Sequence, residues 1–510
     1  MTPDANQAQL LSIFIATISS GQNPVLQPTF RYTTMFLNEV ATIAANSHVL
    51  EWAVRAVSLS HLGRQVQDQH LIQLSRQMYR QALLTLNAAL QDPIDGLSSK
   101  TLAATILLSF YEVINCTENN SWVRHAGGAG HLMRLRGPER HRTCLGRSCF
   151  LAYRHSLVIE AFLSRNATFL AAKPWLDLSR DIQASLPDRT PISDLVDDFH
   201  LLIVELPGFT QSVQDTNATT ASKRKLLASG TAHRENMNAL YKRITTTLKD
   251  TGAEISSRPA STNDPVFPTV YAFPSLAVGS LLCGYWTTLT VLNRNLALLE
   301  NDIVRPSEVS TADVRAAPQR YHLRNSPGDG GKYLEENLKN ARESCRAAEY
   351  LSCSAFLGPL YLIFALRVAW NTFPEGKERD WVLAKLEEVS AHLGIARALL
   401  DVQVQREKEK EKESLSASSS SASLSRSVSV QGRVGASVVT RSPDLNRSAD
   451  GQPEASQKGS AQDVRREGVQ NLSQGDDLSR RTSVSLQEIE RRPSRQEEVS
   501  ESSKAKGVLR

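Results

Sequence analysis

Apolar residues recur at three- and four-residue steps through most of the first 200 positions. One clear case lies within residues 69–91, where the repeated positions are Leu71, Leu74, Met78, Ala82 and Leu86. This spacing places their side chains on one face of a helix. Similar patterns predict helices over residues 5–19, 31–46, 48–67, 69–91, 98–116, 121–136 and 146–165. Alternation with a period of two, which is typical of strands, is nearly absent, so we expect an all-α protein.

The second half of the chain has fewer helical patterns and more breaks. Residues 274–301 are apolar on most faces, which predicts a long buried helix, and further helices are expected at 332–352, 356–372 and 377–412. Polar segments with turn-forming residues predict exposed loops over residues 209–232, 251–268 and 304–331. We therefore expect residues 1–405 to form one large body of packed antiparallel helices.

The last predicted helix carries an apolar stripe at Val382, Leu386, Val389, Leu393, Ala396 and Leu400. These positions are spaced by four and three residues, as in a coiled coil, but they cover fewer than three heptads. A helix docked on its own core is therefore favoured over a dimerising coiled coil. The following REKEKEKE run (406–413) is typical of a solvated helix end.

The C-terminal segment, residues 406–510, has the composition of a disordered tail. From Ser414 onward 23 of 97 residues are serine, and no aromatic residue follows Trp381. Such a segment cannot bury enough apolar surface to offset its chain entropy. Serines that follow arginines are candidate phosphorylation sites, namely Ser427, Ser442, Ser483 and Ser494. A phosphate there would reverse the local charge.

Charge and cysteine content argue against several classes of protein. Residues 1–413 contain 43 Lys/Arg and 41 Asp/Glu, so this part shows no electrostatic footprint for nucleic acid. The six cysteines are scattered and never form C-x-x-C pairs, which favours reduced thiols over disulfides or a zinc site. The apolar N-terminal stretch lacks a preceding basic residue and is a poor signal peptide. We expect a soluble protein without a cofactor or metal in this chain.

The motifs of common enzyme classes are absent from the sequence. There is no H-E-x-x-H, no phosphate-binding G-x-x-x-x-G-K-[ST] and no G-x-G-x-x-G after a strand. There is also no G-x-S-x-G nucleophile elbow, since the nearest serine settings, LGRSCF (145–150) and LAVGSLLCG (276–284), lack its glycine spacing. The sequence therefore predicts no enzyme activity. A helical enzyme without a recognisable motif stays a remote alternative.

The stretch RHAGGAGHLMRLRGPERHR (124–142) combines five arginines, three histidines and four glycines. On a helical projection Trp122, Ala126, Ala129 and Met133 share one face, with Ser121 as N-cap and Gly137-Pro138 as the stop. The glycines therefore lie inside a helix rather than in a phosphate-binding loop, and we expect a neighbouring backbone to pack closely on them. The histidines do not converge on one point. The arginines are expected to bind carboxylates or helix carbonyls.

The run WVRHAGGAGHLMRLRGPERHRTCLGRSCFLAYRHSLVIEAFLSRNATFLAAKPW (122–175) resembles the regulatory domain of fungal zinc-cluster transcription factors. It is similar to the fungal-specific transcription factor domain found in arginine- and GABA-pathway regulators. The signature positions are Trp122, His125, Gly128, Ala129, Arg136, Gly137, Pro138, Phe150 and Arg154. A looser likeness extends over about residues 8–400.

The resemblance implies a nuclear regulator of transcription by RNA polymerase II, whose helical domain responds to a metabolite or partner. Members of the family bind DNA and zinc through an N-terminal cluster of six cysteines, and that cysteine pattern is missing from this sequence. Direct zinc-dependent DNA binding by this chain is therefore not expected. Lys223, Arg224 and Lys225, in a predicted loop, are candidate nuclear-import residues. The alternative function is a scaffold that dimerises with, or titrates, a full-length regulator.

Overall fold

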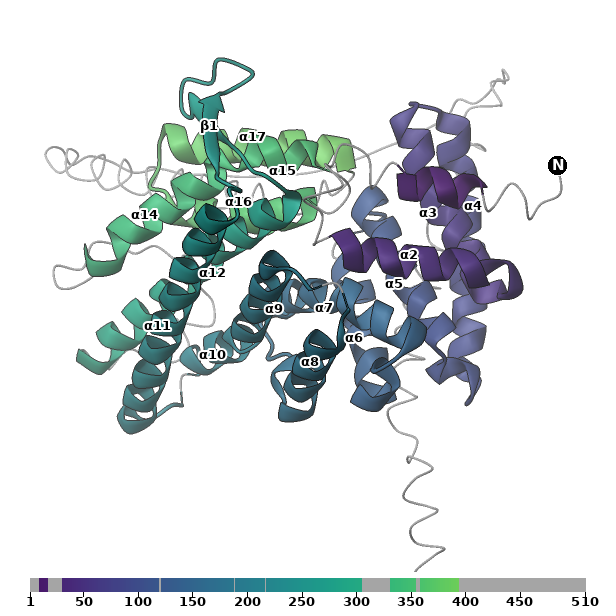
Figure 1. The fold of residues 1–510 in the computed structure, drawn as a ribbon, viewed down its shortest axis with the longest axis horizontal. Helices are drawn as coiled ribbons and strands as arrows, with labels where there is room; N and C mark the ends of the chain where they lie inside the picture. The colour runs from purple at the N-terminus through teal and green to yellow at the C-terminus, as the bar shows by residue number, and fades with distance from the viewer. Residues whose placement is uncertain are drawn as a thin grey trace, which may run out of the picture. The chain divides into compact units, whose positions relative to one another are not determined.

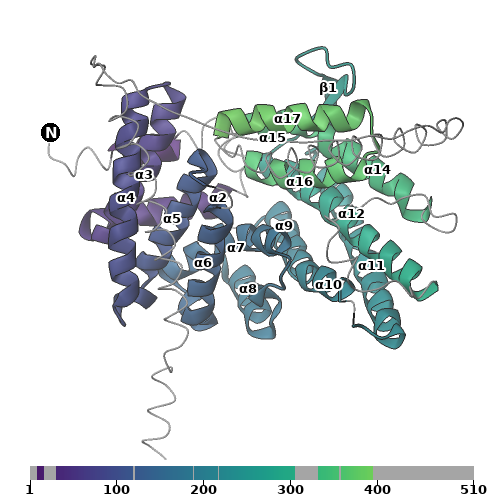
Figure 2. The ribbon, with the colours of Figure 1, turned by 180° about the vertical axis from the view of Figure 1, so that it is seen from behind.

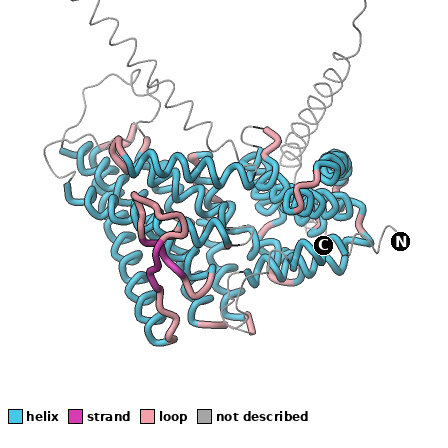
Figure 3. Tube along the Cα trace, turned by 90° about the horizontal axis from the view of Figure 1, so that it is seen from above, coloured by secondary structure: helices cyan, strands magenta, loops and turns pink. Residues whose placement is uncertain are grey.

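The computed structural model describes residues 9–16, 30–118, 121–187, 189–215, 217–304, 331–354 and 358–393, and these ranges are helical almost throughout (Figures 1 and 3). After a helix over residues 9–16, the helices of the first half are α2 (Phe30–Ile43), α3 (His48–Gln65), α4 (Gln69–Gln91), α5 (Ser99–Asn115), α6 (Ser121–Arg136), α7 (Cys144–Ser164) and α8 (Lys173–Ser185). Those of the second half are α9 (Pro191–Ile203), α10 (Leu206–Val213), α11 (Thr220–Asp250), α12 (Leu276–Val304), α14 (Gly331–Arg346), α15 (Ala348–Cys353), α16 (Gly358–Thr372) and α17 (Lys377–Leu393). Short 3-10 turns lie at Ala44–Asn46, Asp95–Leu97, Pro138–His141 and Phe169–Ala171. The predicted all-α class is confirmed.

In the first half, α5 is the central helix. It contacts α3, α4, α6 and α7 (Figure 2). Every residue from Thr101 to Ile114 is buried. The helix begins where the Ser98 side chain accepts a hydrogen bond from the Thr101 backbone N–H at 3.1 Å. A helix this apolar on all sides forms because its neighbours cover every face.

The buried face of α4 differs from the predicted one. The residues that α4 buries are Ile72, Ser75, Tyr79, Ala82, Leu83, Leu86 and Leu90, whereas Leu71, Leu74 and Met78 are half-buried. The face is thus rotated by about one residue, because Ser75 and Tyr79 turn inward to make buried hydrogen bonds. Apolar spacing identified the helix but not its orientation.

In the second half, α12 has the equivalent central position. It contacts α9, α10, α11, α14 and α16. Judged by length and composition alone, it is the one described helix that could cross a membrane, but 83% of its most apolar stretch is buried inside the protein. The burial fits the long core helix that the sequence predicted.

The loop predicted over residues 209–232 is wrong, because α10 and α11 cover most of it. The side chain of Thr219 caps α11 by accepting from the Ser222 backbone N–H at 3.2 Å. The buried positions of α11 are few and its exposed face is polar, so the segment looked like a loop. Residues 251–268 are loop and turn except for β1 (Ser256–Pro259), which pairs antiparallel with β2 (Thr269–Ala272). Most of the predicted loop at 304–331 lies outside the described residues.

The apolar stripe of the last helix is used inside the protein as far as the structure describes it. Val382, Leu386 and Val389 are buried, and α17 contacts α16 and α5. This agrees with a helix docked on its own core. Ala396, Leu400, the charged run at 406–413 and the whole tail lie outside the described residues.

Candidate functional site

A cavity of about 100 Å³ lies where α2, α7, α9, α12 and α16 meet. Its apolar walls include Leu151, Val158, Phe162, Phe199, Leu281 and Phe364. Phe162 and Phe364 stack with ring centroids 5.4 Å apart, which joins the α7 wall to the α16 wall. Because largely apolar concave sites with a few polar groups are typical of small-molecule binding, this cavity is the candidate functional site.

The cavity carries polar groups but no formal charge. None of the described residues that line it is Asp, Glu, Lys or Arg. Thr287 and Thr288 donate hydrogen bonds to the backbone carbonyls of Cys283 and Gly284, each at 2.7 Å, so their hydroxyl hydrogens are occupied. The buried Ser280 Oγ has no hydrogen-bond partner among the described residues.

Among the lining residues, His155 on α7 and Tyr361 on α16 have shifted pKa values. Burial, and then the charge of Arg154, lowers the pKa of His155 to about 3. Burial raises the pKa of Tyr361 to about 12. Both residues are only half-buried. Because both line the cavity, we assign their remaining accessible surface to the cavity. At neutral pH each is uncharged.

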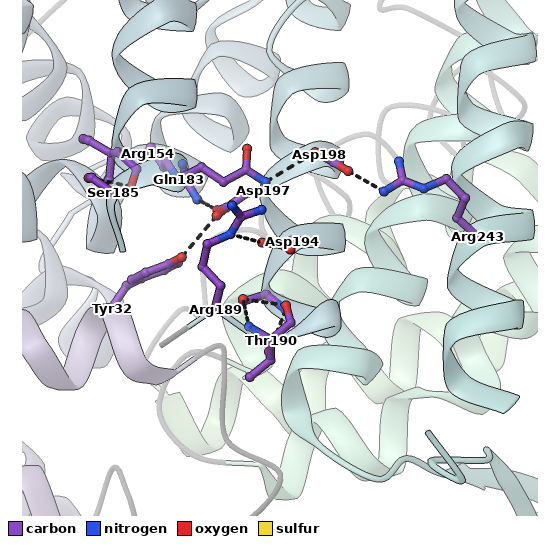
Figure 4. A network of polar contacts seen from close by, with 12 residues as sticks. Tyr32, Arg154, Gln183, Ser185, Arg189, Thr190, Asp194, Asp197, Asp198 and Arg243 are labelled. Carbon is purple, nitrogen blue, oxygen red and sulfur yellow. Dashed lines mark hydrogen bonds and ion pairs between the residues drawn. The ribbon is translucent and has the colours of Figure 1, made fainter. Parts of the chain in front are cut away.

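Behind the cavity a buried ion pair joins α7 to α9 (Figure 4). Arg154 donates to Asp197 Oδ1, and the cavity-lining Tyr32 donates to Asp197 Oδ2 at 3.2 Å. The guanidinium also lies over the Tyr32 ring, 5.6 Å from its centroid. Since both charges are satisfied by each other, the pair fixes three helices around the cavity without making the cavity charged.

The remaining acids of α9 bind other arginines. Asp194 accepts from Arg189 at 2.9 Å, and Asp198 accepts from Arg243 of α11 at 2.7 Å (Figure 4). These two pairs are partly exposed, unlike the pair between Arg154 and Asp197.

Most of the signature residues are buried. Those that are buried are Trp122, His125, Ala129, Arg136, Phe150 and Arg154, whereas Gly128, Gly137 and Pro138 are half-buried. Gly137 ends α6 with a φ of +73°, in the left-handed region that favours glycine. Of these residues, the structure brings Arg154 next to the cavity through Tyr32 and Asp197. Ser121, predicted as an N-cap, instead donates from its hydroxyl to Glu112 at 2.5 Å.

The arginines tie helices together, as expected. Arg136 donates to the Leu97 carbonyl and to Ser99 Oγ at the start of α5, and Arg142 donates to Asp181 of α8 at 2.8 Å. Close packing on the α6 glycines comes from side chains, not backbone. A Cβ added to Gly130 would lie 3.0 Å from Leu157 Cδ2.

The histidines of this stretch lie apart. His125 contacts the Tyr79 hydroxyl at 2.9 Å, and His141 Nδ1 contacts the Gly146 carbonyl at 3.0 Å. The part of the chain that the structure describes holds no group of three or more His, Cys, Asp or Glu placed to bind a metal ion.

The basic triplet lies in the first turns of α11, not in a loop. Lys223 Nζ donates to Asp302 of α12 at 2.7 Å, and Arg224 and Lys225 are exposed. The candidate phosphorylation sites Ser427, Ser442, Ser483 and Ser494 lie outside the described residues.

Sequence reasoning missed the cavity residues. Ser280 lies in the LAVGSLLCG segment, and His155 and Arg154 lie in the YRHS part of the signature, but no spacing rule joins them to Tyr361. Their proximity arises because α7, α12 and α16 all line one cavity, and Phe162 of α7 stacks on Phe364 of α16, 202 positions later in the chain.

Comparison with known proteins confirms the resemblance for the first part of the chain. Residues 9–186 match the fungal specific transcription factor domain. An uncharacterized protein of Emericella nidulans is 32% identical over 199 residues, which make up 38% of this chain and 43% of that relative. The match therefore spans less than half of the relative. No solved structure matches the chain. The matched domain runs from residue 9 through α8 and includes the α2 and α7 walls of the cavity.

Proposed function

We propose that this chain is a regulator of fungal transcription that acts in the nucleus and responds to a small-molecule effector. The observation that carries the proposal is the domain match over residues 9–186, which includes two walls of an uncharged cavity. The other walls come from α9, α12 and α16, so a bound molecule would touch both the matched domain and the later helices. Such contacts give an effector a means of favouring one helix arrangement over another.

We further propose that the chain is not an enzyme. The hydroxyl of Ser280, which lines the cavity, has no hydrogen-bond partner among the described residues that could act as its base. DNA binding is assigned to a partner or to a zinc cluster that this sequence does not contain. Proposed partners are the transcription machinery or another regulator.

Fusion to a heterologous DNA-binding domain tests the transcriptional role. In a fungal host the fusion is expected to change expression of a reporter that carries the matching DNA site, relative to the DNA-binding domain alone. Immunoblotting controls for expression of both proteins. An unchanged reporter, with the fusion present in the nucleus at equal level, would contradict the proposal.

Nuclear entry and regulation by phosphate are tested separately. A fluorescent fusion of the chain is expected to accumulate in nuclei, and alanine substitution of Lys223, Arg224 and Lys225 is expected to reduce that accumulation. The matched control replaces Lys242 and Lys249, later on α11, by alanine. Phosphopeptide mass spectrometry of the purified protein tests phosphorylation at Ser427, Ser442, Ser483 and Ser494. If all four serines are unmodified, phosphorylation at these sites is excluded.

A further inference from the structure

The cavity between α7, α12 and α16 limits the chemistry of its ligand by charge. Its described lining holds no ionised group, and the buried Arg154, which lies next to the cavity-lining His155 in the chain, forms an ion pair with Asp197. An anionic or cationic ligand would lose its hydration here without gaining a counter-charge. Charged metabolites, including carboxylates and phosphates, are therefore excluded from this site.

Two neutral polar groups on the walls are available to a ligand. The Tyr361 hydroxyl and the His155 ring make no hydrogen bonds with the described residues, although each side chain keeps surface that we assign to the cavity. The ring of His155 meets the His200 ring edge to face, 4.8 Å away, and that contact uses neither hydrogen-bonding role. A neutral amide or hydroxyl could bind to this pair, because phenol and imidazole both donate and accept.

Size limits the carbon skeleton. An engineered cavity of about 150 Å³ takes up benzene, which has six non-hydrogen atoms, so in proportion a cavity of about 100 Å³ encloses roughly four. Aromatic walls at Phe162, Phe199 and Phe364 favour a compact branched or cyclic group over an extended chain.

We infer that the cavity binds a small uncharged molecule with a branched or cyclic carbon skeleton and one amide or hydroxyl group. The inference deepens the proposed function, on which it rests for its regulatory meaning. The carbon skeleton packs among the phenylalanines, and the polar group bonds to Tyr361 and His155. The ligand thereby connects α7 of the matched domain to α16.

The test uses three probes of one shape on the purified full chain, measured by ligand-observed NMR titration. The probes are isobutyramide, which is neutral and polar, isobutyrate, which is anionic, and 2,3-dimethylbutane, which is apolar. We expect isobutyramide to bind saturably in the millimolar range and isobutyrate at least tenfold more weakly. Equal binding of the two, or no saturable binding of isobutyramide, would overturn the inference.

Two variants locate the binding. Ala277→Leu fills the cavity from α12 and is expected to abolish binding of every probe. If this variant does not fold, Ala152→Leu, which fills the cavity from α7, is used in its place. Tyr361→Phe is expected to weaken isobutyramide about fivefold to tenfold and to leave 2,3-dimethylbutane unchanged. Amide binding that survives a folded cavity-filling variant would place the site elsewhere and refute the assignment. The binding test needs neither DNA nor transcription. It can therefore fail while the reporter test succeeds, and it can succeed while the reporter test fails.

Discussion

The two carboxylates Asp197 and Glu112 are both buried, but they are stabilised in different ways. Asp197 on α9 faces one guanidinium, that of Arg154, 43 positions earlier. Glu112 on α5 accepts hydrogen bonds from neutral donors, namely Tyr79 Oη at 2.5 Å, the Thr117 backbone N–H at 2.9 Å, Thr117 Oγ1 at 2.7 Å and Ser121 Oγ at 2.5 Å. Because Asp197 has a single counter-charge, one substitution can leave its charge uncompensated, whereas several donors share the stabilisation of Glu112.

Loss of the Arg154 guanidinium is expected to have the largest effect. Arg154→Met leaves the Asp197 charge buried without a counter-charge, which should lower the free energy of unfolding by about 3–5 kcal/mol. Urea unfolding followed by circular dichroism measures the change. The double variant Arg154→Met with Asp197→Asn removes both charges, keeps an acceptor for Tyr32, and is expected to recover much of the loss. A single variant that loses less than about 1 kcal/mol would show that the pair does not stabilise the fold.

Changes at Glu112 are expected to cost less. Glu112→Gln keeps the shape but turns one accepting oxygen into a donor that faces other donors, for an expected loss of about 1–3 kcal/mol. Tyr79→Phe removes one donor of the set and is expected to lower stability by about 1 kcal/mol in the same urea assay. If Glu112→Gln costs as much as Arg154→Met, the proposed difference between the two sites is wrong.

Histidines next to the two carboxylates should respond differently to acid. Burial lowers the pKa of both His125 and His155, but nearby Glu112 opposes the shift at His125, while Arg154 adds to it at His155. Because the folded pKa lies below the ordinary value of about 6.5, the unfolded chain binds protons first. Stability should therefore be full above about pH 6.5 and decrease as the pH falls toward 3.

Urea midpoints between pH 7.5 and 4.5 measure this dependence. His155→Asn is expected to reduce the slope more than His125→Asn, because the pKa of His155, about 3, is depressed further by a neighbouring cation. One histidine contributes up to about 1.4 kcal/mol for each pH unit in the window. A midpoint that rises toward pH 5, or a larger effect of the His125 variant, would contradict the assignment.

The sequence predicted local features better than contacts between distant segments. The helix of residues 121–136, its Gly137 stop and the buried character of residues 274–301 follow from spacing and turn chemistry, which depend on neighbours in the chain. The orientation of α4 was missed because Tyr79 turns inward to reach Glu112, 33 positions away. Such a pairing leaves no periodic signal.

The glycines show the same limit. We expected close backbone packing at the three glycines of α6, yet the nearest neighbour of Gly130 is the Leu157 side chain. Close backbone approach instead occurs at Gly146, where an added Cβ would lie 2.1 Å from the Arg140 carbonyl oxygen. The glycine cluster of α6 is conspicuous in the sequence, but the single glycine between Leu145 and Arg147 has less room for a side chain. This steric requirement follows only from the fold of the 138–146 turn.

The smallest effect is expected at the surface counterpart of the Arg154 pair. Arg243 donates to Asp198, the residue after Asp197, but its side chain is 59% exposed. Because water screens both charges and Asp198 stays hydrated when its partner is lost, Arg243→Ala should change the free energy of unfolding by less than about 0.5 kcal/mol. Arg154 and Arg243 thus bind adjacent acids of one helix and differ mainly in burial. Similar losses from Arg243→Ala and Arg154→Met in matched urea titrations would mean that burial does not set the strength of these pairs.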